Sequence, residues 1–343
     1  MRVALIAPPW IPVPPPAYGG TEAVIDTLAR GLAAAGHEVL LATTGDSTCP
    51  VERTWVYEHA KTDEMGDIAV ELTHLLHAYD AAVSADIVHD HTVAGPVLGS
   101  LRSIPPVVTT NHGPFTDDVR ALHRSLGDRV PIVALSHHHA STAGDVAVAR
   151  VIHHGLDEDR YPAGPGGDHL AFVGRMSPTK GVRQAVEIAE RAGAPLVIAA
   201  KMRSAAEHEY FDTVIKPLLG GNVHYAGELG LADKLELLGG ALALLNPIQW
   251  DEPFGLCMVE ALACGTPVIA TPRGAAPEIV DHGITGFLCT GTEEAVAAIA
   301  WAASLDRLAC RAAATARFSA RRMVADHVAL YRAVLAGRVR PAA

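Results

Sequence analysis

The chain has 343 residues, of which 49% are hydrophobic, and it carries a formal net charge of -11. This length exceeds the size at which a single hydrophobic core keeps growing, so it favours two domains. The acidic balance argues against non-specific attraction to nucleic acid or to an anionic membrane surface, because both need concentrated positive charge. No run of about 18 uninterrupted apolar residues is present, which argues against a membrane-spanning helix.

The first half of the chain alternates short apolar runs with longer, partly helical stretches, which is typical of a parallel α/β sheet. We interpret five runs as strands: residues 3–7, 39–42, 87–89, 107–110 and 132–135. Between the first two, residues 21–35 place Val24, Leu28 and Leu32 on one helical face, and Gly36 ends this helix. Because prolines interrupt the chain directly after the first run, we interpret that run as a strand rather than a signal peptide and expect a cytoplasmic protein.

A stretch rich in Gly and Pro at residues 157–168 is typical of an interdomain linker, and a second alternation of strands and helices follows it. The expected strands are residues 170–174, 196–199, 223–227, 241–245 and 268–271, and the expected helices are residues 182–192, 233–238 and 256–263. A final amphipathic helix is expected at residues 321–335. We therefore predict an N-terminal domain at residues 1–165, a second domain at 166–320 and a C-terminal helical segment at 321–343.

The most informative segment of the chain, residues 249–267, joins two glutamates to a turn and a helix between two apolar strands. Its loop opens at the carboxyl edge of a parallel sheet, where ligands bind in open α/β folds. A helix that begins near Gly255 presents free N–H groups and a positive dipole end there, which favours an anion. Glu252 and Glu260 flank this turn, and ionised carboxylates accept hydrogen bonds from sugar or ribose hydroxyls. The alternative is that Glu260 pairs with a surface base and that Glu252 is a solvated loop residue.

In this segment the sequence resembles the retaining glycosyltransferases of family four, whose signature is a Glu, seven residues and a second Glu. Glu252 and Glu260 have that spacing, and the resemblance covers nearly the whole chain. It implies a GT-B fold, in which two doubly wound, parallel-sheet (Rossmann-like) α/β domains face each other across a cleft and the last helix returns to the first domain. It also implies that Glu252 meets the donor sugar hydroxyls and that Glu260 binds the ribose. The backbone of Phe254, Gly255 and Leu256 would then receive the diphosphate.

Two basic residues follow the first strand of the second domain. Arg175 and Lys180 lie in the loop before its first helix, and each charge-assisted bond to a phosphate oxygen is worth roughly 1.5 to 3 kcal/mol. A pair of ordinary surface bases is the alternative. The resemblance implies that both residues bind the donor diphosphate and offset charge on the departing nucleotide. It also places the loop with Gly19 and Gly20, which opens the first helix, beside the diphosphate and the reacting sugar.

Histidines follow two strands of the first domain. His91 matches a family histidine that lies near the donor sugar, which makes it a catalytic candidate. His112 is either a hydrogen-bonded structural residue or a contact on the sugar and acceptor side. At His154 the chain departs from the Asn-Gly pair that is common in the family, so a contact from this residue stays open. Leu229, after a strand of the second domain, either contacts uracil or makes an ordinary apolar loop contact.

We expect neither a metal nor a cofactor, since a nucleoside-diphosphate sugar is a substrate. The Asp-x-Asp pattern at residues 157–159 is associated with metal-dependent sugar transfer, but it lies in the linker and is interpreted as a solvated turn. The adjacent histidines at 137–139 cannot all face one ion on a regular element. Fixed cations and a helix N-terminus can take a metal's role in stabilising the leaving group.

Together these features predict a metal-independent retaining glycosyltransferase. It would move a sugar from a nucleoside-diphosphate donor, with UDP favoured by family habit, to a small-molecule or oligosaccharide acceptor. The compact, Ala-rich chain looks most like family members that act in antibiotic biosynthesis. A nucleotide-sugar 2-epimerase of the same fold and a non-catalytic nucleotide-sugar-binding subunit are the alternatives. A dehydrogenase is disfavoured because no Gly-x-Gly-x-x-Gly follows a strand.

Overall fold

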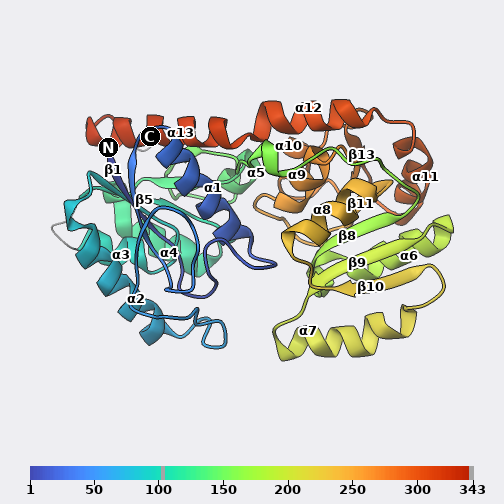
Figure 1. Ribbon diagram of the computed structural model, residues 1–343, viewed down its shortest axis with the longest axis horizontal. Helices are drawn as coiled ribbons and strands as arrows, with labels where there is room; N and C mark the ends of the chain where they lie inside the picture. Colours follow the sequence, from blue (N-terminus) through green and yellow to red (C-terminus); the bar gives the residue numbers. More distant parts are fainter. Residues whose placement is uncertain (102–104, 340–343) are drawn as a thin grey trace. The chain divides into compact units, whose positions relative to one another are not determined.

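The computed structural model describes residues 1–101 and 105–339 and divides into two compact units (Figure 1). The first unit comprises Met1–Leu156 together with the segment that starts at Ala320, and the second unit comprises Asp157–Ser319. Each unit contains one sheet of parallel strands and its own hydrophobic core. The chain therefore leaves the first unit after Leu156 and re-enters it at Ala320.

The first sheet has seven strands in the order β3-β2-β1-β4-β5-β6-β7, and all its pairings are parallel. The strands are β1 (Arg2–Ile6), β2 (Glu38–Ala42), β3 (Glu52–Thr54), β4 (Ile87–Asp90), β5 (Val107–Thr110), β6 (Ile132–Ala134) and β7 (Val148–Val151). Every residue of β4 and β5 is buried, so both faces of the sheet are covered at these central strands. This burial on both faces explains why each strand begins with apolar residues on both of its sides. The strand order reverses between β1 and β4, and the loops after these two strands open at this switch point.

The helices of the first unit connect these strands, and the last of them comes from the end of the chain. They are α1 (Gly20–Ala34), α2 (Ile68–Ala81), η1 (Ala82–Ser84), α3 (Gly95–Ser100), α4 (Asp117–Leu126), η2 (Gly127–Arg129), α5 (His137–Ser141) and α13 (Ala320–Leu335). Figure 1 shows α13 running beside α1. The two helices approach closely at Gly31, where an added Cβ would clash with the side chain of Val324. The C-terminal helix is thus part of the first unit's packing.

The second sheet has six parallel strands in the order β10-β9-β8-β11-β12-β13, with its switch point between β8 and β11. The strands are β8 (Leu170–Arg175), β9 (Leu196–Lys201), β10 (Val223–Gly227), β11 (Ala243–Asn246), β12 (Val268–Ala270) and β13 (Gly286–Leu288). The helical elements are η3 (Glu158–Arg160), η4 (Pro178–Lys180), α6 (Val182–Ala192), α7 (Ala205–Tyr210), η5 (Phe211–Ile215), η6 (Lys216–Leu218), α8 (Leu231–Gly240), α9 (Leu256–Ala263), α10 (Ala276–Ile279), α11 (Thr292–Ala302) and α12 (Arg307–Phe318).

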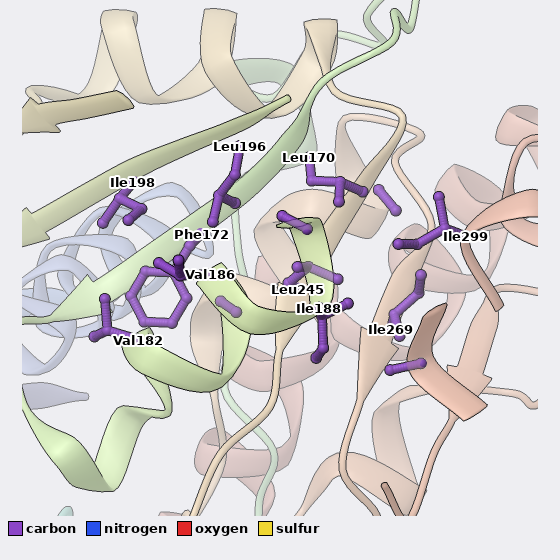
Figure 2. Close-up of a cluster of buried hydrophobic side chains, with 14 of the residues drawn as sticks. Leu170, Phe172, Val182, Val186, Ile188, Leu196, Ile198, Leu245, Ile269 and Ile299 are labelled. Atoms are coloured by element: carbon purple, nitrogen blue, oxygen red, sulfur yellow. The ribbon is translucent and has the colours of Figure 1, made fainter. Parts of the chain in front are cut away.

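The core of the second unit fixes the first strand and helix that carry the basic loop. Figure 2 shows Phe172 from β8 against Val182 and Val186 from α6, with Leu196 and Ile198 from β9 beside them. All five side chains are buried. Burying a side chain of this kind stabilises the fold by about 1.5–3 kcal/mol, so β8 and α6 form a firm support for the loop between them.

The stretch expected as the interdomain linker belongs to the second unit, so the first unit ends at Leu156 rather than at residue 165. The N–H of Gly164 donates to the carbonyl of Cys264 at 2.9 Å, and the N–H of Gly166 donates to that of Gly239 at 2.9 Å. An added Cβ on Gly164 would clash with the backbone of Gly239. These glycines therefore allow two backbone segments to pack closely. A stretch rich in glycine also suggests a flexible linker, which is why the sequence placed the domain boundary too late.

Three strands at the edges of the sheets were not expected from the sequence: β3, β7 and β13. Each has only three or four residues, and β3 and β7 are half-exposed. Short edge strands need no apolar face on both sides, so they lack the continuous apolar run that reveals a central strand. The five expected strands of each half are present, with bounds that differ from the expected ones by at most two residues.

Candidate functional site

Two loops meet at the carboxyl edge of the second sheet, beside its switch point. One follows β8 and the other follows β11. The N–H of Gln249 donates to the carbonyl of Thr179 at 2.8 Å, which ties the loops together. Gly181 has a φ of +76°, and an added Cβ there would clash with the carbonyl of Pro247. This close approach brings the basic residue of the first loop to the acidic residue of the second.

Lys180 and Glu252 form an ion pair at this edge. Their side chains are only 13% and 16% exposed, so solvent screens the pair weakly. Trp250 holds both partners: its indole Nε1 donates to Glu252 Oε2 at 3.1 Å, and Lys180 Nζ lies 5.5 Å from the centre of its ring. The two candidates that sequence reasoning placed on the sugar and on the phosphate are therefore direct neighbours.

Helix α9 begins beside this pair, and no side chain caps its N-terminus. Gly255 at the N-cap has a φ of 95° and a ψ of 61°, a conformation that glycine adopts without strain. Phe254 is buried and makes an edge contact with Phe318, with ring centres 5.9 Å apart. The buried phenyl ring anchors the turn, so the backbone of Gly255 and Leu256 lies at the open, positive end of the helix dipole.

Glu260 lies deeper in the same helix and is 4% exposed. It accepts from Lys234 Nζ of α8 at 2.6 Å and from the hydroxyl of Tyr161 at 3.2 Å. Burial and the nearby carboxylate of Glu260 raise the pKa of Tyr161, which keeps this hydroxyl protonated as a donor. Glu260 is therefore neither solvated nor unpaired, because a half-buried lysine and a buried tyrosine satisfy its carboxylate.

Cys257, the second residue of α9, marks the point where these charges converge. Burial raises the pKa of its thiol to about 12, and Lys180 and Lys234 lower this pKa while Glu252 and Glu260 raise it. Two lysine–glutamate pairs thus flank the start of one helix. The structure brings together the predicted residues Lys180, Glu252, Glu260 and the 254–256 turn.

Arg175, the last residue of β8, belongs to a different group of charges. Its guanidinium lies 3.6 Å from Glu207, and its neighbour in the sheet register is Lys201. Burial, with the charges of Arg203 and Arg175, lowers the pKa of Lys201 to about 8. Arg175 remains 43% exposed and can therefore turn toward a ligand at the sheet edge. The half-buried Leu229 follows β10, two strands away in the same sheet.

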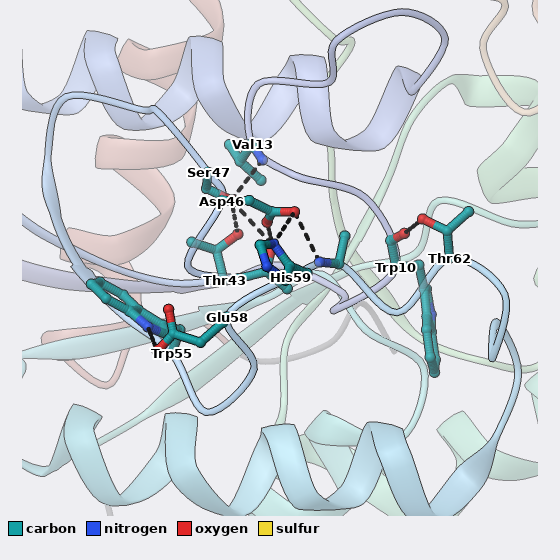
Figure 3. A network of polar contacts seen from close by, with 11 residues as sticks. Trp10, Val13, Thr43, Asp46, Ser47, Trp55, Glu58, His59 and Thr62 are labelled. Atoms are coloured by element: carbon teal, nitrogen blue, oxygen red, sulfur yellow. Dashed lines mark hydrogen bonds and ion pairs between the residues drawn. The ribbon is translucent and has the colours of Figure 1, made fainter.

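The proline-rich loop after β1 in the first unit is held by a polar network (Figure 3). Ser47 Oγ accepts from the N–H of Val13 at 2.9 Å and lies 2.8 Å from Thr43 Oγ1. Thr62 Oγ1 donates to the carbonyl of Trp10 at 2.7 Å. The carboxylate of Asp46 accepts from the N–H of Ala60 at 3.0 Å. Ser47 ties the loop to the segment after β2, Thr62 ties it to the segment after β3, and Asp46 joins these two segments, so the shape of the loop is set before any ligand arrives.

Gly19 and Gly20 end this loop, and Gly20 is the first residue of α1. An added Cβ on Gly19 would meet Pro15 Cβ at 2.7 Å and Glu22 Oε2 at 2.8 Å, whereas one on Gly20 would meet nothing within 4 Å. Gly19 is therefore required by the loop's own packing. Gly20 leaves open space beside a helix N-terminus, which suits close approach of a ligand.

Histidines gather at the carboxyl edge of β4 and β5 in the first unit. His91 Nδ1 lies 2.9 Å from His112 Nε2, and the ring of His112 stacks on His154 with centres 5.3 Å apart. His91 also packs on His89 with ring centres 4.1 Å apart. Burial lowers the pKa of His112 to about 3 and holds the pKa values of His89, His91 and His154 well below the usual range. These imidazoles are therefore neutral at physiological pH.

Helix α13 adds side chains to this cluster, and its Tyr331 lies 242 residues after His89 in the sequence. His89 Nδ1 lies 2.6 Å from the hydroxyl of Tyr331, and its Nε2 lies 2.7 Å from Thr110 Oγ1. His327, with a burial-lowered pKa of about 4, lies 5.1 Å from His89 by ring centres. Both ring nitrogens of His89 are thus bonded inside the protein, which makes it a structural residue and leaves His91 and His112 as the candidates for ligand contact.

Sequence reasoning did not find four of the residues that shape these sites: Tyr161, Lys234, Trp250 and Tyr331. Tyr161 lies in the stretch interpreted as the linker, and Tyr331 lies in the amphipathic helix expected at residues 321–335. Lys234 lies in an expected helix, and Trp250 stands next to the acidic segment. The nearness of Trp250 to Glu252 in the sequence is the one signal that was available.

A metal centre and a membrane-spanning helix are two other features that a chain of this kind could contain. Within residues 1–101 and 105–339, no three His, Cys, Asp or Glu side chains are grouped so that they could hold a metal ion. Over the same residues, no helix is both long and apolar enough to cross a bilayer. The Asp-x-Asp pattern at residues 157–159, which was expected to form a solvated turn, contributes to the short 3₁₀ helix η3 and its N-cap.

Several solved structures share this architecture. Sucrose-phosphate synthase from Thermosynechococcus elongatus superposes with a TM-score of 0.83 at 20% identity, covering 98% of this chain and 99% of that one. AviGT4, a glycosyltransferase involved in avilamycin A biosynthesis, gives a TM-score of 0.76 at 28% identity, with 98% of both chains covered. The Anabaena protein HepE, solved with UDP and glucose, gives 0.75 at 20% identity over 97% and 99% of the two chains. The two parallel-sheet units are those of a GT-B glycosyltransferase.

Family comparisons agree with the fold. Residues 18–160 match the family described as glycosyltransferase family 4, and residues 159–317 match the one described as glycosyl transferases group 1. The chain belongs to the glycosyltransferases that these two models describe, which use a sugar-nucleotide donor.

Curated relatives differ in their substrates. The alpha-maltose-1-phosphate synthase of Mycobacterium tuberculosis is 27% identical over 338 residues, with 84% of each chain covered. The D-inositol 3-phosphate glycosyltransferase of Mycolicibacterium gilvum is 30% identical over 259 residues, with 69% of this chain and 53% of that protein covered. The family therefore includes enzymes with different named activities.

Proposed function

We propose that this chain is a retaining, metal-independent glycosyltransferase that transfers a sugar from a UDP donor to a hydroxyl of a small-molecule or oligosaccharide acceptor. The observation that carries the proposal is the Lys180–Glu252 pair beside the uncapped start of α9. A lysine, a carboxylate and free helix amides at one sheet edge match the phosphates and hydroxyls of a nucleoside-diphosphate sugar.

Donor binding would exchange the partners of this ion pair. The diphosphate would replace Glu252 as the partner of Lys180, and the freed carboxylate would accept from the sugar hydroxyls. The N–H groups of Gly255 and Leu256 would receive phosphate oxygens at the positive end of α9. Glu260 would keep its bond to Lys234 and offer its remaining acceptor capacity to the ribose.

The reaction would proceed on one face of the sugar. The bond from the anomeric carbon to the phosphate oxygen breaks, and the acceptor hydroxyl oxygen forms a new bond from the same side. The acceptor proton passes to the departing phosphate oxygen, so charge and atoms balance. Lys180, Arg175 and the α9 amides would offset the charge that develops on the diphosphate, which is the usual role of a metal in such transfers.

The nucleotide and the acceptor class rest on separate support. HepE, which shares the fold, was solved with UDP and glucose, and AviGT4 acts in avilamycin A biosynthesis. The loop from Trp10 to Pro16 in this chain is held rigidly by Ser47 and Thr62, which suits recognition of a defined small molecule. We therefore propose a place in antibiotic biosynthesis.

A thermal-shift panel with UDP, GDP, ADP and their sugars tests the donor. A ligand that binds only the folded chain stabilises it by about 2.7 kcal/mol when present at 100 times its Kd. We expect UDP and one UDP-sugar to raise the melting temperature most, and product analysis with an acceptor panel should show retained anomeric configuration. Preference for another diphosphate would overturn the UDP assignment, and a C2-inverted sugar without any acceptor would indicate an epimerase instead.

A further inference from the structure

His91 has one bonded and one unbonded ring nitrogen. Its side chain is 5% exposed, and its Nδ1 lies 2.9 Å from His112 Nε2. Its Nε2 is buried and has no hydrogen-bond partner among residues 1–101 and 105–339. Buried polar atoms without a partner are rare because each costs the free energy of its lost hydration. A ligand atom is the natural partner for this nitrogen.

The partner ring is held in place from its other side. His112 follows β5 and stacks on His154 at an interplanar angle of 23°, and the N–H of Gly113 donates to Asn111 Oδ1 at 3.2 Å. The stack therefore gives His112 a fixed direction toward His91.

The proton arrangement of the pair follows from its neutrality. Each neutral imidazole carries one N–H, so across the 2.9 Å bond one ring donates and the other accepts. His112 is only half-buried, and a neutral histidine in contact with water prefers its proton on Nε2. His112 then donates from Nε2 to Nδ1 of His91, and the proton of His91 is left on Nε2.

We propose that His112 is a positioning residue, which fixes the tautomer of His91 and so makes the buried Nε2 a hydrogen-bond donor to a hydroxyl oxygen of the sugar substrate. The identity of this ligand rests on the proposed function. The tautomer does not, because it is a property of the free protein.

Nuclear magnetic resonance of the free protein tests the tautomer directly. Long-range ¹H–¹⁵N spectra of histidine-labelled protein distinguish a protonated ring nitrogen from an unprotonated one, and His91→Gln identifies the His91 signals by their loss. We expect His91 to be protonated on Nε2. His112→Phe keeps a stacking ring and removes the donor, so the His91 signals should move toward an average of the two tautomers. His112→Gln keeps an N–H at the same place and should preserve them.

Kinetics supply the functional readout. His112→Phe should raise the KM for the donor sugar nucleotide by about tenfold with kcat changed less than about twofold, because a bond made equally in ground and transition states affects KM alone. His112→Gln should stay within about threefold of the wild type. His123→Phe, the same change at a buried histidine of α4, is the matched control and should alter neither the His91 signals nor KM.

The outcomes separate this inference from the proposed function. Protonation of His91 on Nδ1 in the wild type, or identical His91 signals in the wild type and in a folded His112→Phe, would overturn the inference whatever the activity. If the tautomer changes as expected while no sugar nucleotide binds, the positioning role stands and the proposed function fails.

Discussion

The carboxyl edges of the two sheets are built from opposite kinds of polar chemistry. At the first edge, His89 and His91 are buried and His112 is half-buried, and all three rings are neutral and bonded to uncharged partners. At the second edge, Lys180–Glu252 and Lys234–Glu260 are charged pairs around one helix start. Neutral rings hold hydrogen bonds without attracting counter-ions, whereas ion pairs can exchange a partner for a charged ligand. The first edge should therefore respond to protons, and the second edge should respond to anions.

Acidification should reveal the largest difference between the two units, because we expect the first unit to unfold at a higher pH than the second. Burial lowers the pKa of His74, His139 and His327 to about 4 from 6.5. Between these values the unfolded chain takes up protons that the folded chain refuses, so stability is full above pH 6.5 and falls toward pH 4. Each such histidine costs about 2 kcal/mol by about pH 5.

One group in the same unit opposes this trend. Burial raises the pKa of Asp90 from 3.8 to about 6, so its contribution to stability is lost as pH rises through 6 and returns on acidification. The histidines outnumber it. Hydrogen exchange at pH 7.5 and at pH 5 should show loss of protection in β4 while β11 stays protected. Simultaneous loss in both strands would contradict the prediction.

Breaking the Lys234–Glu260 pair at the second edge should destabilise the second unit. Glu260→Gln keeps the shape of the side chain and leaves Lys234 without its counter-charge; because Lys234 is 20% exposed, we expect a loss below the about 3–5 kcal/mol that a fully buried pair would cost. Glu293→Gln is the control, because Glu293 pairs with Arg191 on the surface at 78% exposure and such pairs are worth about 0–1 kcal/mol. Urea unfolding followed by tryptophan fluorescence measures both. Equal losses would refute the distinction.

Removing the positive charge of the exchangeable pair should act on catalysis rather than on folding. Lys180→Met takes away one group that offsets charge on the diphosphate, and losing one such group lowers kcat by about 10²–10³-fold. Lys216→Met, which breaks an exposed pair with Asp212 in the same unit, should leave transfer near wild type. Initial rates of sugar transfer decide the matter, and near-normal turnover by Lys180→Met would remove Lys180 from the site.

Much of the fold follows from local sequence patterns. The helices α6 and α9 begin and end where expected, because Gly181 and Gly255 mark their starts with positive φ angles and each helix joins two apolar strands. The linker was misplaced because glycines that pack backbone on backbone look the same in sequence as glycines in a flexible loop. Edge strands such as β3 escaped because their half-exposed side chains show no apolar run.

The candidate site was predictable in its residue types and not in its pairings. The spacing of Glu252 and Glu260 is a local property, so it can be read directly. Lys180 meets Glu252 across 72 residues, and Tyr331 meets His89 across 242, and such contacts depend on how the whole chain folds. The catalytic and binding roles of the individual residues stay predictions until the variants above are measured.

The discontinuity of the first unit sets an order of events during synthesis. The second unit is encoded by one uninterrupted segment, Asp157–Ser319, whereas the first unit needs α13, which is synthesised only after that segment. Until then β4 lacks the hydroxyl that bonds His89, and the face of α1 around Gly31 lacks its covering helix. The second unit can therefore fold before the first unit is complete. Until α13 is synthesised, the surface that it covers in the finished first unit stays exposed.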